Sequence, residues 1–360
     1  MHNITIGVIG SHSALDICRG AKAEGFKTLV VAEKGRERTY DKYYKTKNNL
    51  GCVDECIVLD KFSDIITIQG KLNKRNVIFI PNRSFEVYMN FDYEAIETSF
   101  KVPMFGNKYL LKIEERGRKP NQYDLLKAAH ISYPKQFTNP KDIDRLCIIK
   151  VLESKRKFER AFFFAKNYNE YETKSKKMID EGIITQKGLN SSVIEEYIIG
   201  TQVNFNFFYS PLSKRLELLG TDTRRQTNYE GFTNLPAKFQ KELDGEVNIT
   251  FEEAGHIAVT VLESLLEKVF ALGEQFVEAT QKISSPGIIG PFALQCIITS
   301  GPPQKDIIVI DVSPRMPGSP GIYATPYSDY LFGKPMSVGR RVALEIKQSF
   351  ENNSINTITT

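Results

Sequence analysis

Short apolar runs alternate with amphipathic segments through the first hundred residues. The apolar runs lie at residues 4–9, 28–32, 56–59 and 77–80. Between the first two runs, apolar residues recur at helical spacing and end at Gly25, which predicts a helix over residues 13–26. Buried strands joined by helical crossovers form a parallel sheet that is covered on both faces. The pattern therefore predicts an open, doubly wound parallel α/β domain over residues 1–119.

The pattern changes near residue 120, after a loop at residues 102–107 and a charged stretch. Beyond it the sequence predicts helices at residues 122–129 and 169–180 and strands at residues 147–151, 161–165, 193–199 and 203–209. An order of strand, loop, strand, helix and strand differs from that of a doubly wound sheet. A second domain is therefore expected to begin near residue 120.

The last third of the chain contains one long amphipathic segment and one predicted hairpin. Thr250 followed by Glu253 fits a helix-capping box, so a long helix is predicted to start near Thr250. Its recurring apolar positions are Ile257, Val261, Leu265, Val269, Leu272 and Phe276. Apolar stretches at residues 288–299 and 306–312 flank the turn sequence Ser-Gly-Pro-Pro, which predicts a β-hairpin.

Composition narrows the class of protein. The chain has 360 residues, of which 41% are hydrophobic and 25% are charged, which argues against a disordered chain, a fibre or a repeat array. No apolar stretch approaches the roughly 20 residues that span a bilayer, and the N-terminus lacks the features of a targeting segment. Five cysteines at irregular spacing form neither a disulfide framework nor a zinc motif. We expect a cytoplasmic protein with no membrane partner.

The charge of the chain bears on its partners. The net charge is only +5, and the 48 Lys and Arg residues are spread widely. Proteins that bind nucleic acids usually concentrate their positive charge on one element. We therefore expect no nucleic-acid partner. An enzyme or a binding protein for small anionic molecules fits the composition.

Polar residues follow two strands of the predicted parallel sheet. His12 and Ser13 come after the first apolar run, and Arg83 and Ser84 come after the fourth. Because the carboxyl ends of parallel strands meet at one edge of a sheet, these side chains are expected to converge there. The free N–H groups of the helix that follows favour a phosphate at this edge. The alternative is helix capping by Ser13 and Asp16.

Two further features fit nucleotide binding. Lys150 ends a predicted strand just before a loop, where its ammonium group could contact a nucleotide phosphate. Glu195 and Glu196 interrupt another strand, whose backbone could pair with an adenine edge. Taken singly, the two features also fit an ordinary surface lysine and an ordinary edge strand.

The predicted hairpin places a carboxylate within an apolar strand. Asp311 would be costly there without a neighbouring cation. Gln295 lies on the adjacent strand, and Arg315 follows shortly after Asp311. Magnesium binds a few protein oxygens and completes its shell with phosphates and water, so Gln295 and Asp311 could hold it. The alternative is a buried Asp–Arg salt bridge.

The order of these features resembles the ATP-grasp fold. A lysine strand with a loop, an acid-bearing strand and a metal-bearing hairpin follow one another along the chain. More narrowly, residues 4–347 resemble the archaeal formate-dependent ligases of purine synthesis, the FAICAR synthetases, whose product is 5-formaminoimidazole-4-carboxamide ribonucleotide (FAICAR). The motifs that carry this resemblance are Gly10-Ser11-His12-Ser13, Val102-Pro103-Met104-Phe105-Gly106-Asn107, Glu195-Glu196-Tyr197, Tyr209-Ser210-Pro211-Leu212 and Gly290-Pro291-Phe292-x-Leu294-Gln295.

The resemblance implies a fold and a reaction. The fold would be an ATP-grasp fold preceded by the parallel α/β domain, with a small subdomain over residues 120–200 and a C-terminal subdomain over residues 201–360. The reaction would be an ATP-dependent ligation of formate to the amine of aminoimidazole-carboxamide ribonucleotide (AICAR), through formyl phosphate, with ADP and phosphate released. ATP, formate and AICAR would be the small-molecule substrates, and Mg²⁺ or Mn²⁺ the metal. The resemblance further implies a homo-oligomer.

The resemblance also implies roles for single residues. The residues that match AICAR-binding positions are His12, Ser13, Ser84 and Asn228. The residues that match ATP-binding positions are Lys150, Glu195, Glu196, Tyr197 and Ile198, together with Arg156 and Arg160 of the loop after Lys150. The residues that match metal positions are Gln295 and Asp311, and those that match catalytic positions are His12 and Arg315.

The sequence departs from the family at two places. The family's loop after the lysine is rich in glycine, whereas residues 151–162 contain none, so the basic side chains of the loop would cover the phosphates instead. Asp311 stands where family members carry Glu. These departures leave two alternatives open. The chain could be a paralogue that acts on another amine or ribonucleotide, or a regulatory module that binds ATP or a purine nucleotide without turnover.

Overall fold

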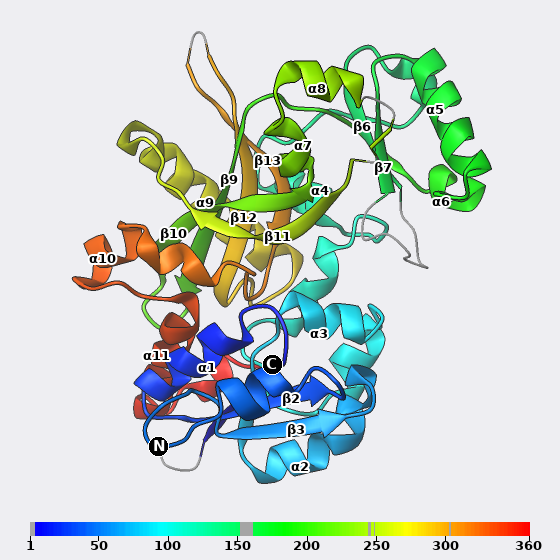
Figure 1. Cartoon of the computed structure of the whole chain (residues 1–360). Coiled ribbons are helices and arrows are strands. Elements are labelled where there is room, and N and C mark those ends of the chain that lie inside the picture. Colours follow the sequence, from blue (N-terminus) through cyan, green and yellow to red (C-terminus); the bar gives the residue numbers. More distant parts are fainter. Residues whose placement is uncertain (1–3, 152–160, 244–245, 248, 302–303) are drawn as a thin grey trace.

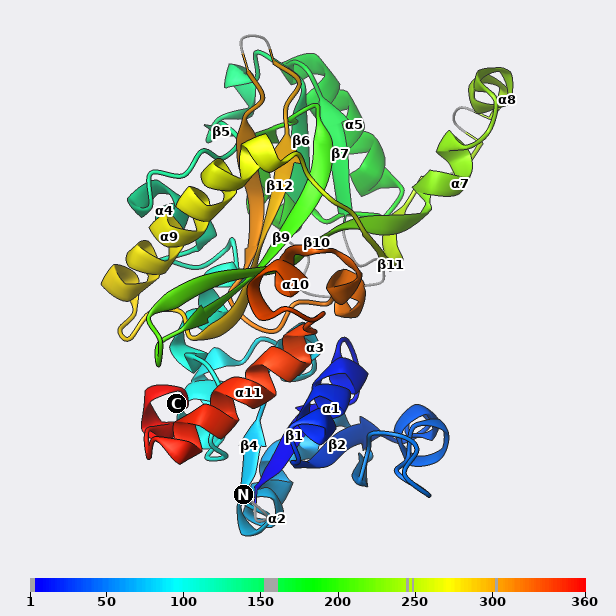
Figure 2. The same ribbon diagram turned by 90° about the vertical axis from the view of Figure 1, so that its left-hand side faces the viewer.

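Three β-sheets and the helices packed around them make up the computed structural model (Figure 1). The described residues are 4–151, 161–243, 246–247, 249–301 and 304–360. The N-terminal sheet lies at one end of the molecule, and the other two sheets lie at the opposite end. Figures 1 and 2, which are perpendicular views, both show this arrangement.

The N-terminal sheet is parallel throughout, with the strand order β3-β2-β1-β4. Its strands are β1 (Thr5–Ile9), β2 (Lys27–Glu33), β3 (Glu55–Leu59) and β4 (Val77–Phe79). One face is covered by α1 (Ala14–Ala23) and α11 (Val338–Glu351). The other face is covered by the 3₁₀ segment Phe62–Ile68, α2 (Gln69–Lys74) and α3 (Arg83–Tyr88). The predicted parallel domain is confirmed, and a helix from the far end of the chain completes its cover.

Two glycines bring α1 and α11 into backbone contact. A Cβ atom on Gly20 would lie 2.2 Å from the backbone nitrogen of Arg340, and one on Gly339 would lie 2.4 Å from the backbone oxygen of Asp16. The C-terminal helix is thereby fixed on the N-terminal domain. The predicted boundaries near residues 120 and 200 remain predictions, and this contact joins residues from both ends of the chain.

We expect Gly20→Ala to lower the free energy of unfolding by about 2 kcal/mol, because the added methyl group would meet rigid backbone of α11. Gly70→Ala in α2 is the matched control. A Cβ atom on Gly70 meets nothing within 4 Å, so alanine should leave stability unchanged or raise it by up to about 1 kcal/mol. Thermal denaturation of both variants checks this, and equal midpoints would contradict the close crossing.

The second sheet is small and antiparallel, with the strand order β5-β8-β6-β7. Its strands are β5 (Gln136–Phe137), β6 (Cys147–Val151), β7 (Ala161–Ala165) and β8 (Val193–Glu196). Helices α5 (Tyr168–Asp180) and α6 (Gln186–Asn190) pack on its apolar face. The strand predicted over residues 193–199 is shorter than expected and ends at Glu196, because the following residues connect this sheet to the next one.

The third sheet has five antiparallel strands in the order β11-β10-β9-β12-β13. They are β9 (Thr201–Ser210), β10 (Arg215–Asn228), β11 (Phe251–Ala258), β12 (Gly290–Ile298) and β13 (Ile307–Ser313). Helices α4 (Gln122–Ala128) and α9 (Leu266–Ile283) pack against one face. The strands of the predicted hairpin, β12 and β13, pair as expected. Helices α7 (Tyr229–Thr233), α8 (Ala237–Glu242) and α10 (Tyr327–Phe332) lie around this sheet.

The long helix predicted from Thr250 is wrong in its first half. Residues 251–258 form strand β11, which pairs with β10, and α9 begins only at Leu266. Thr250 caps no helix, because its Oγ1 accepts a hydrogen bond from the N–H of Asn228 at 3.1 Å. Of the six apolar positions that suggested the helix, only Ile257 lies on this strand, whereas Val269, Leu272 and Phe276 lie on α9. Pairing with β10 sets the conformation of residues 251–258.

Among the described residues, no helix combines the length and apolar character that crossing a membrane requires.

Candidate active site

The five-stranded sheet has one apolar face and one polar face. Along β9, Phe205 and Phe207 are buried in the core beneath α9, whereas Asn204 and Asn206 alternate with them and face the opposite side. Both asparagines are almost fully buried, at 3% and 0% exposed. Sequence reasoning missed them, although the alternation Asn-Phe-Asn-Phe within a predicted strand was a usable signal.

A row of polar residues crosses this face at one level of the sheet. Asp311 of β13 is paired with Gln295 of β12, Gln295 with Asn204 of β9, and Asn204 with Asp222 of β10. The Asn204 amide donates to Asp222 Oδ2 at 2.8 Å, and the Asn206 amide donates to Asp222 Oδ1 at 2.6 Å. The two residues predicted to bind metal therefore lie side by side, at one end of a larger polar row.

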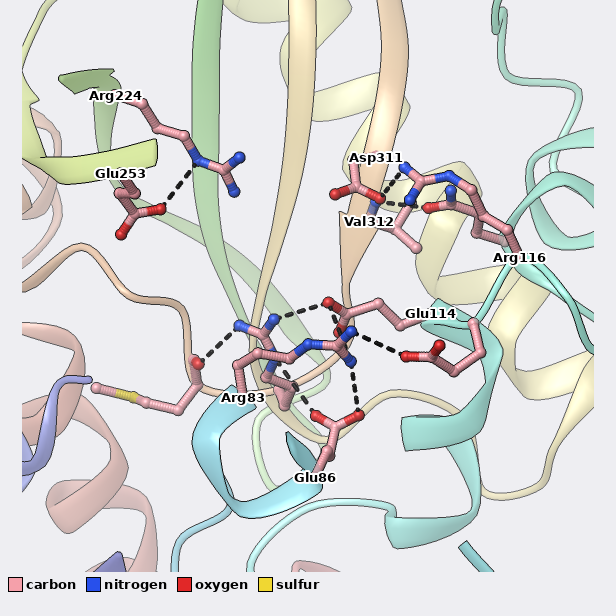
Figure 3. A network of polar contacts seen from close by, with 12 residues as sticks. Arg83, Glu86, Glu114, Arg116, Arg224, Glu253, Asp311 and Val312 are labelled. Atoms are coloured by element: carbon pink, nitrogen blue, oxygen red, sulfur yellow. Dashed lines mark hydrogen bonds and ion pairs between the residues drawn. The ribbon is translucent and has the colours of Figure 1, made fainter. Parts of the chain in front are cut away.

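Lys150 and Asp311 are linked by a chain of polar contacts. The Lys150 ammonium pairs with Glu195, whose other carboxylate oxygen accepts the Tyr123 hydroxyl at 2.7 Å. Arg116 donates from Nε to that hydroxyl at 3.1 Å and from Nη2 to Asp311 Oδ1 at 2.8 Å (Figure 3). This series of polar contacts connects the small sheet, α4 and β13. Sequence reasoning missed Arg116 and Tyr123, because no motif marks them.

The charges in this series of polar contacts favour an anionic ligand beside Lys150. Burial lowers the pKa of Lys150, and the positive charge of Arg116 lowers it further, whereas Glu195 raises it. Glu195 is 2% exposed and the Lys150 side chain is 24% exposed. The carboxylate is therefore enclosed, while part of the Lys150 side chain is open to solvent.

The segment from Glu196 to Ile198 connects the small sheet to the large one. The N–H of Glu196 donates to the carbonyl of Lys135 at 2.8 Å, and the N–H of Tyr197 donates to the carbonyl of Leu146 at 2.9 Å. The segment is thereby tied to the edge of the small sheet. It lies directly after Glu195, which pairs with Lys150, so these predicted ATP-binding residues lie close together, and their contact with ATP stays a prediction.

The segments after β1 and β4 meet around Asn82, at the edge of the parallel sheet. The Asn82 amide donates to the carbonyl of His12 at 2.9 Å, and its Oδ1 accepts the N–H of Phe85 at 3.1 Å, which caps α3 beside the buried Ser84. Asn82 also forms a bridge with Met316, just after β13. The segments after β1, β4 and β13 therefore meet at Asn82, whereas the convergence of the His12 and Ser84 side chains remains a prediction.

Ser13 does not cap α1 with its side chain. Its Oγ donates to the carbonyl of Pro317 at 2.6 Å, and Asp16 accepts the N–H of Gly339 at 2.8 Å instead. The capping alternative for Ser13 and Asp16 is therefore wrong. Both side chains tie α1 to segments from the other end of the chain, an arrangement that local spacing could not reveal.

Arg315 lies in a buried cluster of charges with Arg83, Glu86 and Glu114, and Figure 3 labels the last three of these residues. Its Nη2 is 2.8 Å from Glu114 Oε1, and its Nε is 3.6 Å from Glu86 Oε1. Arg83 approaches the same carboxylates at 3.1 Å and 3.5 Å. Burial raises the pKa of Glu86 to about 7, and the nearby charge of Glu114 adds to this shift. Arg315 therefore joins two parts of the chain.

Asn228 lies at a distance from the polar row. Asn228 lies six residues beyond Asp222 on β10, roughly 20 Å along an extended strand, where its Oδ1 accepts the N–H of Thr250 at 2.9 Å. The predicted ATP-binding residues Arg156 and Arg160 lie outside the described residues, so their role stays a prediction.

The polar row fits a hard divalent cation. Gln295 and Asp311 offer an amide oxygen and a carboxylate, which Mg²⁺ prefers. Asn204, beside Gln295, has a buried Oδ1 atom without a hydrogen-bond partner among the described residues. No group of three or more His, Cys, Asp or Glu side chains suited to a metal occurs in the described part of the chain.

The three sheets and their polar face define the class of protein. A small sheet with a buried lysine, a large antiparallel sheet and a preceding parallel domain are the parts of an ATP-grasp enzyme. The solved ADP complex of an N5-carboxyaminoimidazole ribonucleotide synthetase shares this fold, with a TM-score of 0.58 over 94% of this chain and 79% of that chain, at 12% identity. The predicted ATP-grasp fold is confirmed.

Closer relatives identify the family. A protein-family model described as a domain of unknown function (DUF1297) matches residues 170–360, and one described as a protein of unknown function (DUF1246) matches residues 6–137. The chain is similar to the 5-formaminoimidazole-4-carboxamide-1-(beta)-D-ribofuranosyl 5'-monophosphate synthetase of Methanosphaera stadtmanae. The two sequences are 35% identical over 99% of this chain and 95% of that protein. This chain is 37% identical, with the same coverage, to the synthetase of that name from Methanothermobacter thermautotrophicus.

A solved structure agrees with these relatives. The IMP biosynthesis protein PurP from Thermococcus kodakaraensis matches with a TM-score of 0.73 and 26% identity, over 99% of this chain and 100% of that chain. This chain belongs to the 5-formaminoimidazole-4-carboxamide ribonucleotide synthetase family, so the predicted resemblance is confirmed.

Proposed function

We propose that this chain is an ATP-dependent ligase that joins formate to the amine of AICAR and releases FAICAR, ADP and phosphate. The observation that carries the proposal is the identity of 35% and 37%, over 99% of the chain, to synthetases named for that product. ATP, formate and AICAR are its small-molecule substrates, and Mg²⁺ is its metal, which Mn²⁺ could replace. A homo-oligomer is the assembly that we propose, in the cytoplasm.

The chemistry requires an activated acyl group, because formate is a poor acyl donor. One formate oxygen attacks the γ-phosphorus of ATP, the bond from that phosphorus to its bridging oxygen breaks, and ADP leaves. The AICAR amine then forms a C–N bond with the formyl carbon. The C–O bond to phosphate breaks, and the nitrogen loses a proton. The protein's task is to hold the reactants in line and to stabilise the charge on the phosphoryl group.

The residues on the polar face suit these tasks. Lys150 contacts a phosphate of ATP through its open side, and Glu195 keeps the ammonium group in position. The backbone of the segment from Glu196 to Ile198 binds the adenine. Mg²⁺, held by Gln295 and Asp311, supplies charge neutralisation on the phosphate oxygens. His12 binds AICAR or accepts the amine proton.

We expect purified protein to release ADP only when formate and AICAR are both present with ATP and Mg²⁺. Omission of each substrate in turn is the control. With formate labelled by ¹⁸O at both oxygens, one label should appear in phosphate and one in FAICAR, because formate attacks phosphorus through oxygen.

Three other results of these experiments would contradict the proposed reaction. ADP release without AICAR or formate would mean a different substrate, which is the paralogue alternative. ATP binding without ADP release under any condition would support a regulatory module. Unlabelled phosphate would contradict the formyl phosphate intermediate.

A further inference from the structure

Arg224 presents an unused guanidinium group on the polar face of the large sheet. It lies on β10, two residues beyond Asp222, and its side chain is 13% exposed. Its Nε is 3.3 Å from Glu253 Oε2. Figure 3 shows both terminal nitrogens projecting from this pair, and neither donates a hydrogen bond to another residue in the described part of the chain. A half-enclosed guanidinium with two free N–H edges is suited to bind an oxyanion.

Glu253 is itself held by a second cation. Its Oε1 is 2.9 Å from Nε2 of His256, and Nδ1 of His256 contacts Asp222. Although burial opposes the charge, the hydrogen bonds to Asp222 and Glu253 raise the pKa of His256 to about 9. Despite burial, His256 and the charge of Arg224 lower the pKa of Glu253 to about 2. Positive and negative side chains therefore alternate along this series of contacts, in the order Arg224, Glu253, His256 and Asp222. These contacts hold the guanidinium group of Arg224 in position.

The cluster faces the predicted AICAR-binding edge. A Cβ atom on Gly318 would lie 3.4 Å from Nδ1 of His12 and 4.0 Å from Nε2 of His256, so both imidazoles lie close to this glycine. The positive charge of His12 also lowers the pKa of Glu253, which places the two groups within electrostatic reach. Arg224 thus belongs to the side of the polar face that approaches His12. Asp311 and Gln295 lie toward the opposite edge of the sheet.

We propose that Arg224 binds an oxyanion of the substrate that is not ATP, and that Glu253 and His256 are positioning residues for its guanidinium group. The oxyanion is either the carboxylate of formate or the 5'-phosphate of the ribonucleotide, and the shared chemistry is a bidentate, charge-assisted contact. This inference rests on the proposed function. Neither His256 nitrogen is free, since both face carboxylates, so the imidazolium acts through Glu253 rather than on the ligand.

Kinetics of Arg224→Gln test the inference. Loss of the contact should raise the KM of one oxyanion substrate by about ten- to hundredfold and leave the KM of ATP unchanged. Arg224→Lys, which retains the charge without the fork, should recover part of the loss. Arg225→Gln is the matched control, because Arg225 is the adjacent residue, is 52% exposed and pairs with Glu230. It should leave every KM unchanged.

Two arms distinguish the source of the oxyanion. If Arg224 binds formate, the KM of formate rises and that of AICAR is unchanged. If it binds the 5'-phosphate, the KM of AICAR rises, and the preference for AICAR over its riboside, which lacks the phosphate, shrinks. Either result supports the proposal. Unchanged KM values for both substrates, in a variant with the parent's thermal midpoint, would overturn it.

His256→Asn tests the positioning role. It should raise the same KM as Arg224→Gln, by a smaller factor, without changing the KM of ATP. In the parent, that KM should rise as the pH passes about 9, since a neutral imidazole can donate to only one of Asp222 and Glu253. The charged or polar groups that face His256 are Asp222, Glu253, Arg224, His12 and Ser319. A pH profile that persists in His256→Asn would overturn the role of His256.

Calorimetry without ATP separates this inference from the proposed function. AICAR and formate are titrated into the parent and into Arg224→Gln. Absence of binding of either compound to the parent would overturn both proposals. Equal binding of both compounds to the parent and the variant would overturn the role of Arg224 and leave the proposed function intact.

Discussion

Arg315→Met is expected to lower the free energy of unfolding by about 3–5 kcal/mol, because it leaves buried carboxylates without one of their two cations. Glu86 is fully buried, and the side chains of Glu114 and Arg315 are each only 8% exposed. Methionine fills a similar volume, so the loss arises from charge rather than from a cavity. Urea or thermal denaturation at pH 7.5 measures the effect.

A double variant separates charge from other causes. Arg315→Met combined with Glu114→Gln removes one carboxylate with the cation and should recover much of the lost stability. Arg315 is also a predicted catalytic residue. If it contacts a substrate, the double variant should regain stability but not turnover. A single variant as stable as the parent would contradict the importance of the cluster for the fold.

The same cluster predicts how stability depends on pH. The pKa of Glu86 is raised from 4.5 to about 7, first by burial and then by Glu114. Because the folded state binds this proton more tightly than the unfolded state, the contribution is complete below about pH 4.5 and is lost as the pH rises through 7. Glu86→Gln cannot ionise and should flatten this dependence. An unaltered pH profile in that variant would contradict the raised pKa.

Asp311→Asn is expected to lower kcat by about a hundredfold or more, since removal of a single preorganised electrostatic group from an active site has effects of that size. Asparagine retains the shape of the side chain but loses the charge that would attract Mg²⁺. Steady-state rates over a range of Mg²⁺ concentrations, together with binding of Mn²⁺ and ADP followed by the paramagnetism of Mn²⁺, measure the effect.

Asp311 also pairs with Arg116 at 2.8 Å, so the variant disturbs a salt bridge as well. Two further variants distinguish the causes. Asp311→Glu, which keeps the carboxylate, should retain metal binding and most of the activity. Arg116→Gln should weaken the contacts to Tyr123 and Asp311 but retain Mn²⁺ binding. Normal Mn²⁺ affinity in Asp311→Asn would reduce Asp311 to a salt-bridge partner, the alternative that the sequence left open.

Much of the fold could be predicted because its signals are local. Buried strands such as β1 and β2 are short apolar runs, and the pairing of β12 with β13 follows from two such runs around the sequence Ser-Gly-Pro-Pro. Residues 251–258 were predicted to be helical but form strand β11, because the local sequence there does not distinguish a helix from a strand. Strand β11 lies at an edge of its sheet, is largely exposed along its length, and depends on pairing with β10 for its conformation.

The sequence by itself determined the family resemblance, the parallel domain and the positions of Lys150, Glu195, Gln295 and Asp311 on strands, because spacing within a strand is a local property. Only the tertiary structure decided which of these side chains meet. Contacts such as those of Arg116 with Asp311, or Arg315 with Glu114, join residues about 200 positions apart, at separations of 195 and 201. Such contacts depend on strand order, register and domain packing, which spacing along the chain does not encode. The approach of His12 and His256 to the same glycine, Gly318, is of the same kind.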